Sequence, residues 1–83
     1  MPVSFERMRE MEGKRVRMCF TDGNQIVARL LSATEDIEGF HHLIYDSVEW
    51  ANDPDELARS AGATSYAEGE TLESIDEAAA AHA

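Results

Sequence analysis

The stretch 13–30 constrains the fold more than any other part of this chain, because it joins two strand-like runs through a turn signal. Its first half alternates polar residues with three apolar ones: Val16, Met18 and Phe20. A period of two is typical of a strand with one buried face. Asp22-Gly23 follows, and both residue types accept the backbone of a tight turn. The stretch predicts a β-hairpin with strands at about 14–21 and 25–34.

The second predicted strand carries apolar residues on both faces. One face would hold Ile26, Ala28 and Leu30, and the other Val27, Leu31 and Ala33. A flat strand at the surface of a small domain would show a cleaner alternation. The pattern therefore predicts a long, bent strand that serves two sides of a small barrel.

A short helix is predicted before the hairpin, at about residues 4–12. Ser4 can cap its N-terminus and Gly13 can end it. An apolar stripe recurs every three residues along it, at Phe5, Met8 and Met11. We expect this stripe to close the open end of the barrel.

Beyond residue 39 the chain predicts strands and one further helix. Residues 40–50 are rich in aromatic and β-branched types and would form either one strongly curved strand or two strands broken near Asp46-Ser47. A short helix is expected near 53–60, where Asp53 can act as the cap and Pro54 suits the first turn. Within the uncertain stretch 64–77, residues 72–76 are the candidate closing strand. We expect residues 1–77 to form one domain and 78–83 to be a disordered tail.

Size and composition restrict what such a domain can be. A chain of 83 residues buries only about 60% of its unfolded surface, so oligomerisation is expected to add stability. The single cysteine excludes an internal disulfide and points to a reducing compartment. No apolar run approaches the length of a membrane span. A cytoplasmic protein without a membrane partner is the expectation.

Charge is distributed unevenly along the chain. Residues 1–31 hold six basic against four acidic residues, whereas 32–83 hold one basic against thirteen acidic, and the total is −10. Such a field repels phosphate backbones, which disfavours nucleic acid as a partner. A local basic face stays possible on the hairpin, at Lys14, Arg15, Arg17 and Arg29. The preferred explanation is a solvated strand face that balances the acidic remainder.

The hairpin residues also resemble a known family. Gly13, the three alternating apolar residues and Asp22-Gly23 stand at the spacing of the first motif of Sm and Sm-like proteins, and Leu30 fits it as well. Ala28 occupies the place where that family prefers Gly. The resemblance covers about residues 4–31 and implies a strongly bent, five-stranded SH3-like barrel after a short N-terminal helix. It suggests a small bacterial Sm-like protein of unknown function.

The second half departs from the family where its RNA-binding residues would stand. The loop after the second strand, Glu35-Asp36-Ile37-Glu38-Gly39, is long and acidic and contains no Asn. The last apolar segment, Leu72-Glu73-Ser74-Ile75, lacks the family's Arg-Gly pair. The resemblance therefore implies a fold, and no RNA-contacting residue is carried across.

Chemistry-bearing residues are few. His41 and His42 are adjacent, so in a regular strand they point to opposite faces and do not readily bind one metal. A site that combines His42 with Asp46 or Glu38 is the less favoured reading; the favoured one has one histidine packed or hydrogen-bonded and the other exposed. No cofactor motif or catalytic constellation stands out.

Two aromatic residues, Tyr45 and Trp50, have two interpretations. Exposed Tyr and Trp are enriched in protein recognition surfaces. In so small a domain a role in the core is favoured for both. Taken together, the sequence predicts a mainly β, non-enzymatic barrel that acts through self-assembly or a protein partner. Its candidate contact residues are Lys14, Arg15, Arg17, Arg29, His42, Tyr45 and Trp50.

Overall fold

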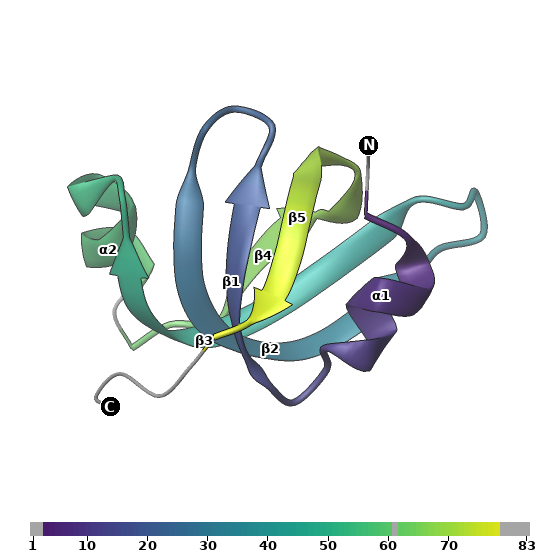
Figure 1. Cartoon of the computed structure of the whole chain (residues 1–83), viewed down its shortest axis with the longest axis horizontal. Helices are drawn as coiled ribbons and strands as arrows, with labels where there is room; N and C mark the ends of the chain where they lie inside the picture. The colour runs from purple at the N-terminus through teal and green to yellow at the C-terminus, as the bar shows by residue number, and fades with distance from the viewer. Residues whose placement is uncertain (1–2, 61, 79–83) are drawn as a thin grey trace.

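The computed structural model describes residues 3–60 and 62–78, which form five strands and two short α-helices (Figure 1). In chain order these are α1 (Phe5–Glu10), β1 (Arg15–Phe20), β2 (Gln25–Glu35), β3 (His41–Ala51), α2 (Pro54–Ser60), β4 (Ser65–Glu68), the 3-10 turn η1 (Gly69–Thr71) and β5 (Leu72–Glu77). The mainly β fold with two short helices is confirmed. The predicted tail 78–83 lies, apart from Ala78, outside the described residues.

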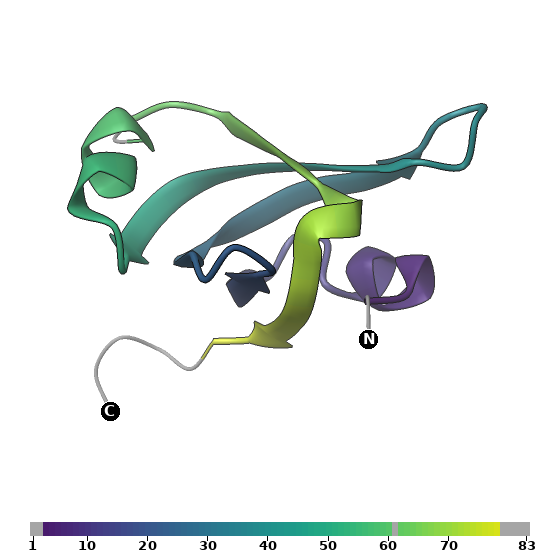
Figure 2. The ribbon, with the colours of Figure 1, turned by 90° about the horizontal axis from the view of Figure 1, so that it is seen from above.

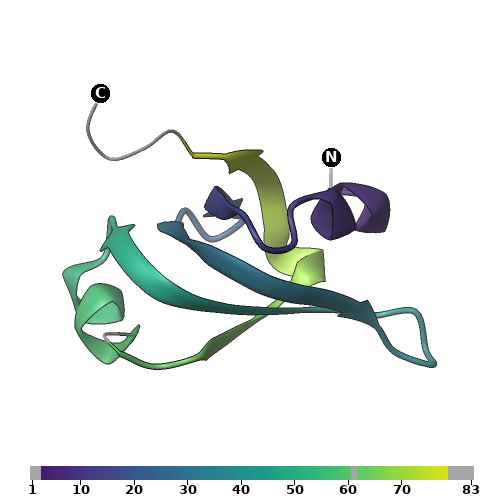
Figure 3. The same ribbon diagram turned by 90° about the horizontal axis from the view of Figure 1, so that it is seen from below.

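All strand pairs are antiparallel, and the strands are arranged in the order β4-β3-β2-β1-β5. The sheet bends so strongly that β1 and β5 lie across the concave side of the long β2–β3 hairpin (Figures 2 and 3). Among the described residues no pairing joins β4 to β5, so these two strands are the edges of an open sheet. The closed barrel expected from the sequence therefore stays a prediction.

The predicted hairpin is confirmed, with its turn at Asp22-Gly23. Gly23 has φ +93°, a conformation that costs a residue without Cβ little. The Asp22 carboxylate accepts a hydrogen bond from the Asn24 backbone N–H at 2.9 Å, which closes the turn. From here β1 pairs with β2 from Arg15 opposite Arg29 to Cys19 opposite Gln25.

Two irregularities bend the long strands. Register shifts occur between Val27 and Arg29 and between Leu30 and Ser32, where β2 pairs with β3. At the first of these, Ser47 of β3 has φ +52°, as expected for a residue that bulges out of a ladder. Residues 41–51 are thus one strand with a bulge next to Asp46, which resolves the two alternatives left open by the sequence. The second shift turns both Leu30 and Ala33 into the core.

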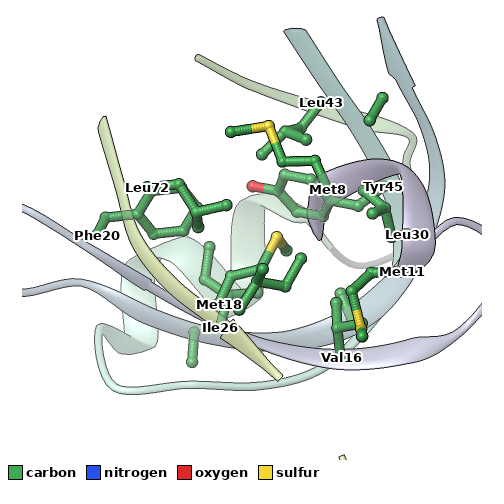
Figure 4. Close-up of a cluster of buried hydrophobic side chains, with 14 residues drawn as sticks. Met8, Met11, Val16, Met18, Phe20, Ile26, Leu30, Leu43, Tyr45 and Leu72 are labelled. Carbon is green, nitrogen blue, oxygen red and sulfur yellow. The ribbon is translucent and has the colours of Figure 1, made fainter. Parts of the chain in front are cut away.

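The core fills the concave side of the sheet (Figure 4). It consists of fourteen buried apolar or aromatic side chains from α1 and its C-cap and from every strand except β4: Met8, Met11, Val16, Met18, Phe20, Ile26, Ala28, Leu30, Ala33, Leu43, Tyr45, Ala51, Leu72 and Ile75. Met8 and Met11 come from the predicted stripe of α1, and Phe5 packs against the cluster from its side. Burial of this apolar surface is the main favourable contribution to folding.

The two helices lie at opposite ends of the sheet (Figure 1). Helix α1 is capped by the Ser4 hydroxyl, which accepts from the Arg7 backbone N–H at 3.2 Å, and Gly13 with φ +81° follows its last turn. Helix α2 starts after Asp53, whose carboxylate accepts from the Asp55 backbone N–H at 3.0 Å. Both helix starts are where the sequence predicts them.

Candidate functional site

The predicted basic face lies on the outer side of β1 and β2, with Lys14 just before β1, and two of its four cations have a carboxylate partner. Arg15 forms a two-pronged ion pair with the Glu49 carboxylate of β3, with 2.9 Å between Nη2 and Oε1. This pair raises the pKa of Arg15 and lowers that of Glu49. Lys14 lies 3.6 Å from Glu77 of β5. Arg29 is exposed and stands opposite Asp46 in the sheet register. Two of the four cations are thus neutralised, which weakens this face as a phosphate-binding strip.

Trp50 belongs to this outer face, not to the core. The residue is 42% exposed, and the Arg17 guanidinium lies 5.4 Å from the centroid of its ring. Both residues are cross-strand partners of Val27, which is only 4% exposed although it lies outside the core cluster. The core role favoured for Trp50 is wrong, because the side chain covers Val27 on the opposite side of the sheet.

Tyr45, in contrast, lies in the core with 4% exposure. Burial raises the pKa of its hydroxyl, and the nearby Glu56 carboxylate raises it further, while a hydrogen bond with Ser65 acts in the opposite direction. The core role favoured for Tyr45 is therefore confirmed, and its ring offers little surface to a partner.

The two histidines are both engaged, on opposite sides of β3. His41 Nε2 lies 3.0 Å from Glu35 and its Nδ1 lies 3.2 Å from Glu70 of η1. Its ring stacks on Phe5 of α1, with 4.8 Å between centroids. The expectation of one exposed histidine is therefore wrong, since acidic and aromatic partners from three elements meet at this end of the sheet.

His42 connects Asp36 to Tyr66 of β4. Its Nε2 lies 2.8 Å from Asp36 Oδ2, and its Nδ1 lies 2.7 Å from the Tyr66 hydroxyl. The hydrogen bond with His42 is the first cause of a lowered Asp36 pKa, and the backbone N–H groups of Phe40 and Glu38 contribute as well. His42 thus pairs with neither Asp46 nor Glu38, the ligands considered from the sequence. Among the described residues no group of three or more His, Cys, Asp or Glu side chains is placed to hold a metal ion.

Two cavities flank the solvent-facing side chains of β4. The first has a volume of about 320 Å³ and lies between the β1–β2 turn, α2 and β4. The second, of about 290 Å³, lies beside the β2–β3 loop and is lined by Asp36, Phe40, His42, Tyr66, Glu68 and Glu70. Tyr66 and Glu68 line both. Sequence reasoning missed these two residues, because the pattern around 65–68 gave no strand signal strong enough to place them.

The two edges of the sheet differ in how they are protected. Ala78 donates its backbone N–H to the Arg15 carbonyl at 2.8 Å. Since hydrogen-bonded and non-bonded pairs alternate in an antiparallel ladder, the backbone groups of Ile75 then point away from β1. Arg7 of α1 donates from Nε to this Ile75 carbonyl at 3.3 Å and from Nη2 to Asp76 at 3.1 Å. The free edge of β5 is therefore partly covered by a side chain from α1.

The comparisons with known proteins give no assignment. No family model, curated protein or solved structure matches this chain at a significant level. In the part of the chain that the structure describes, no helix has the length and apolar character required to span a bilayer.

Proposed function

We propose that this protein is a non-enzymatic interaction module that contacts other protein chains, a second copy of itself included, through the open edge at β4. The observation that supports this best is the pair of unequal sheet edges. An unpaired edge strand presents backbone donors and acceptors that can bind another strand. Arg7 covers part of the β5 edge, whereas β4 displays a half-exposed tyrosine, Tyr66, next to its edge.

The strand order supports a finer structural proposal. In the order β4-β3-β2-β1-β5 the last strand of the chain, β5, pairs with the first one, β1. A 3-10 turn connects β4 to β5 along the chain. Together with the bent β2 and the N-terminal helix, this arrangement is compatible with the SH3-like or Sm-like barrel that the hairpin motif suggests. We extend the proposal to such a barrel, whose remaining gap lies between β4 and β5. The single cysteine leads us to propose a cytoplasmic location as well.

The engagement of the histidines supports a role without catalysis. Both ring nitrogens of His41 and of His42 lie within 3.2 Å of a carboxylate or a hydroxyl. A general base needs a nitrogen within reach of a substrate proton. These side chains instead join α1, β3, β4 and η1, a structural task.

Two alternatives have less support. An RNA-binding role through Lys14, Arg15, Arg17 and Arg29 would need cations available to phosphates, but Glu49 and Glu77 pair with two of them and the net charge is −10. A metal or ligand site at His42 would require the ring to leave both Asp36 and Tyr66.

Static light scattering of the full chain over a range from low to high micromolar concentration tests the proposal. The mass is expected to rise above the 9.2 kDa of one chain as concentration increases. Tyr66→Asp places a charge beside the β4 edge and should abolish this rise. Ile37→Asp adds the same charge at a fully exposed apolar residue of the β2–β3 loop and should leave the rise unchanged. A monomeric mass at every concentration, or equal behaviour of the two variants, would exclude self-assembly at β4.

A further inference from the structure

The cavity beside the β2–β3 loop combines aromatic surface with negative charge. Phe40 and Tyr66, two of its lining residues, are 53% and 52% exposed. Exposed aromatic side chains that line one cavity are a common feature of binding surfaces, where Tyr is enriched. The imidazole of His42 and three carboxylates, from Asp36, Glu68 and Glu70, complete the lining. We name this site the acidic–aromatic pocket.

The three carboxylates differ in how far the protein already uses them. Asp36 accepts hydrogen bonds from the backbone of Glu38 and Phe40 and from His42. Glu70 accepts from the backbone N–H of His41 and lies beside its ring. Glu68 is exposed, and within the described residues its carboxylate has no hydrogen-bond or ion-pair partner. It is the carboxylate most available to a ligand.

The pocket is held in shape before any ligand arrives. Tyr66 and Asp36 are both bonded to His42, at 2.7 and 2.8 Å, so the loop and β4 are fixed relative to each other. Preorganised side chains lose less conformational entropy when a ligand binds. With a neutral ring the Tyr66 hydroxyl donates to Nδ1 and Nε2–H donates to Asp36, and with a protonated ring Nδ1–H donates to that hydroxyl instead. Both arrangements keep the same two contacts.

The side chains of permanent charge that line the pocket are all acidic. Partial loss of solvation raises the pKa of the Tyr66 hydroxyl, and the charges of Glu68, Glu70 and Asp36 raise it further. The same field that opposes a tyrosinate anion attracts a cation. No arginine or lysine lines this cavity.

We propose that the acidic–aromatic pocket binds an arginine side chain from an exposed segment of a protein partner. A guanidinium is flat, stacks on aromatic faces and donates in a fork to a carboxylate, so one group satisfies both chemical features of the lining. Glu68 is the principal acceptor, and Phe40 and Tyr66 supply the aromatic faces. The inference deepens the proposed function by naming the chemistry that β4 and its neighbourhood recognise.

An NMR titration tests this with a defined probe. The ¹⁵N-labelled chain is titrated with a capped Gly-Arg-Gly peptide and, separately, with capped Gly-citrulline-Gly, which has the same shape without the charge. We expect amide signals of residues 36–42 and 66–70 to move with a dissociation constant in the millimolar range for the arginine peptide only. Glu68→Gln should weaken binding by about fivefold or more, which corresponds to loss of one charge-assisted contact of about 1 kcal/mol.

Glu73→Gln is the matched control, since it removes one exposed carboxylate from β5, outside the pocket. Its effect should stay below about twofold. Equal weakening by the two variants would mean that only the overall negative charge attracts the peptide, and would overturn the proposal. So would equal binding of the citrulline peptide, or no signal change at tens of millimolar peptide.

The outcome is separable from that of the proposed function. If light scattering finds a monomer while arginine binds, self-assembly is excluded and the pocket remains. If the chain assembles at β4 but the arginine peptide does not bind, the module remains and the pocket assignment is wrong.

Discussion

At the scale of single residues, Gly69 shows how closely α1, β3 and η1 approach one another. A Cβ at this position would lie 2.5 Å from the His41 Cβ and 3.0 Å from the Met8 Cε. The Met8 end group can move, but the His41 Cβ is attached directly to the backbone of β3. Gly69 is required here by packing and not by backbone conformation, since no positive φ is found at this residue.

Gly69→Ala is therefore expected to lower the free energy of unfolding by about 1–3 kcal/mol, the usual cost of an added methyl group in a closely packed site. Urea unfolding followed by Trp50 fluorescence measures the change. Glu73→Ala, an exposed change on β5, should alter stability by less than about 0.5 kcal/mol. An unchanged midpoint for Gly69→Ala would show that β3 and η1 separate more easily than their contact implies.

Secondary-structure elements determine which surfaces are free. Helix α1 covers the end of the core with Met8 and Met11, and it also reaches the β5 edge through Arg7. Side chains that occupy the outward groups of an edge strand are a common protection against unwanted strand pairing. On β4 the Thr71 hydroxyl donates to the Glu68 carbonyl at 2.7 Å. Among the hydrogen bonds of the described residues no side chain reaches the backbone of Tyr66, so that part of the β4 edge is the more exposed one.

Arg7→Ala should uncover the Ile75 carbonyl and increase self-association, because β5 then offers a second free edge. Light scattering should give a higher average mass for this variant than for the original chain at equal concentration. Arg9→Ala removes the same charge from the same helix without touching β5 and serves as the control. A mass equal to that of the original chain would mean that Arg7 does not limit pairing at β5.

At the scale of the whole molecule, the charge of −10 is combined with carboxylates whose pKa values are lowered by local partners. Glu12 accepts a hydrogen bond from the Ala33 backbone N–H at 2.8 Å, and its pKa is lowered mainly by that bond. The pKa values of Asp36 and Glu49 are lowered mainly by His42 and Arg15, respectively. A carboxylate with a lowered pKa in the folded state stabilises the fold above its unfolded pKa, and this contribution is lost as pH falls through the folded value.

The free energy of unfolding is accordingly expected to decrease as the pH falls below about 4, the ordinary range for these carboxyl groups. Denaturant unfolding at a series of pH values measures the slope of the free energy of unfolding against pH. Glu49→Gln and Arg15→Met should each make the slope shallower, because either change removes the same ion pair. The double variant should be no shallower than the single ones, and additive effects would show that the pair does not act as a unit.

Much of the fold could be predicted because its signals are local in the sequence. Alternation at Val16, Met18 and Phe20, the Asp22-Gly23 turn and the Ser4 cap each act within a few residues, where propensity and hydrogen bonding are independent of the distant chain. The sequence by itself therefore determined the hairpin and the helix starts.

Only the tertiary structure decided the composition of the candidate site. Asp36 and Tyr66 are 30 residues apart in the chain, and they meet at His42 because β4 pairs with β3 in one particular register. A similar long-range arrangement placed Trp50 beside Arg17 on the outer face, and Arg7 on the β5 edge. Such contacts depend on strand order and register, which are set by the packing of the whole sheet, and no local pattern encodes them.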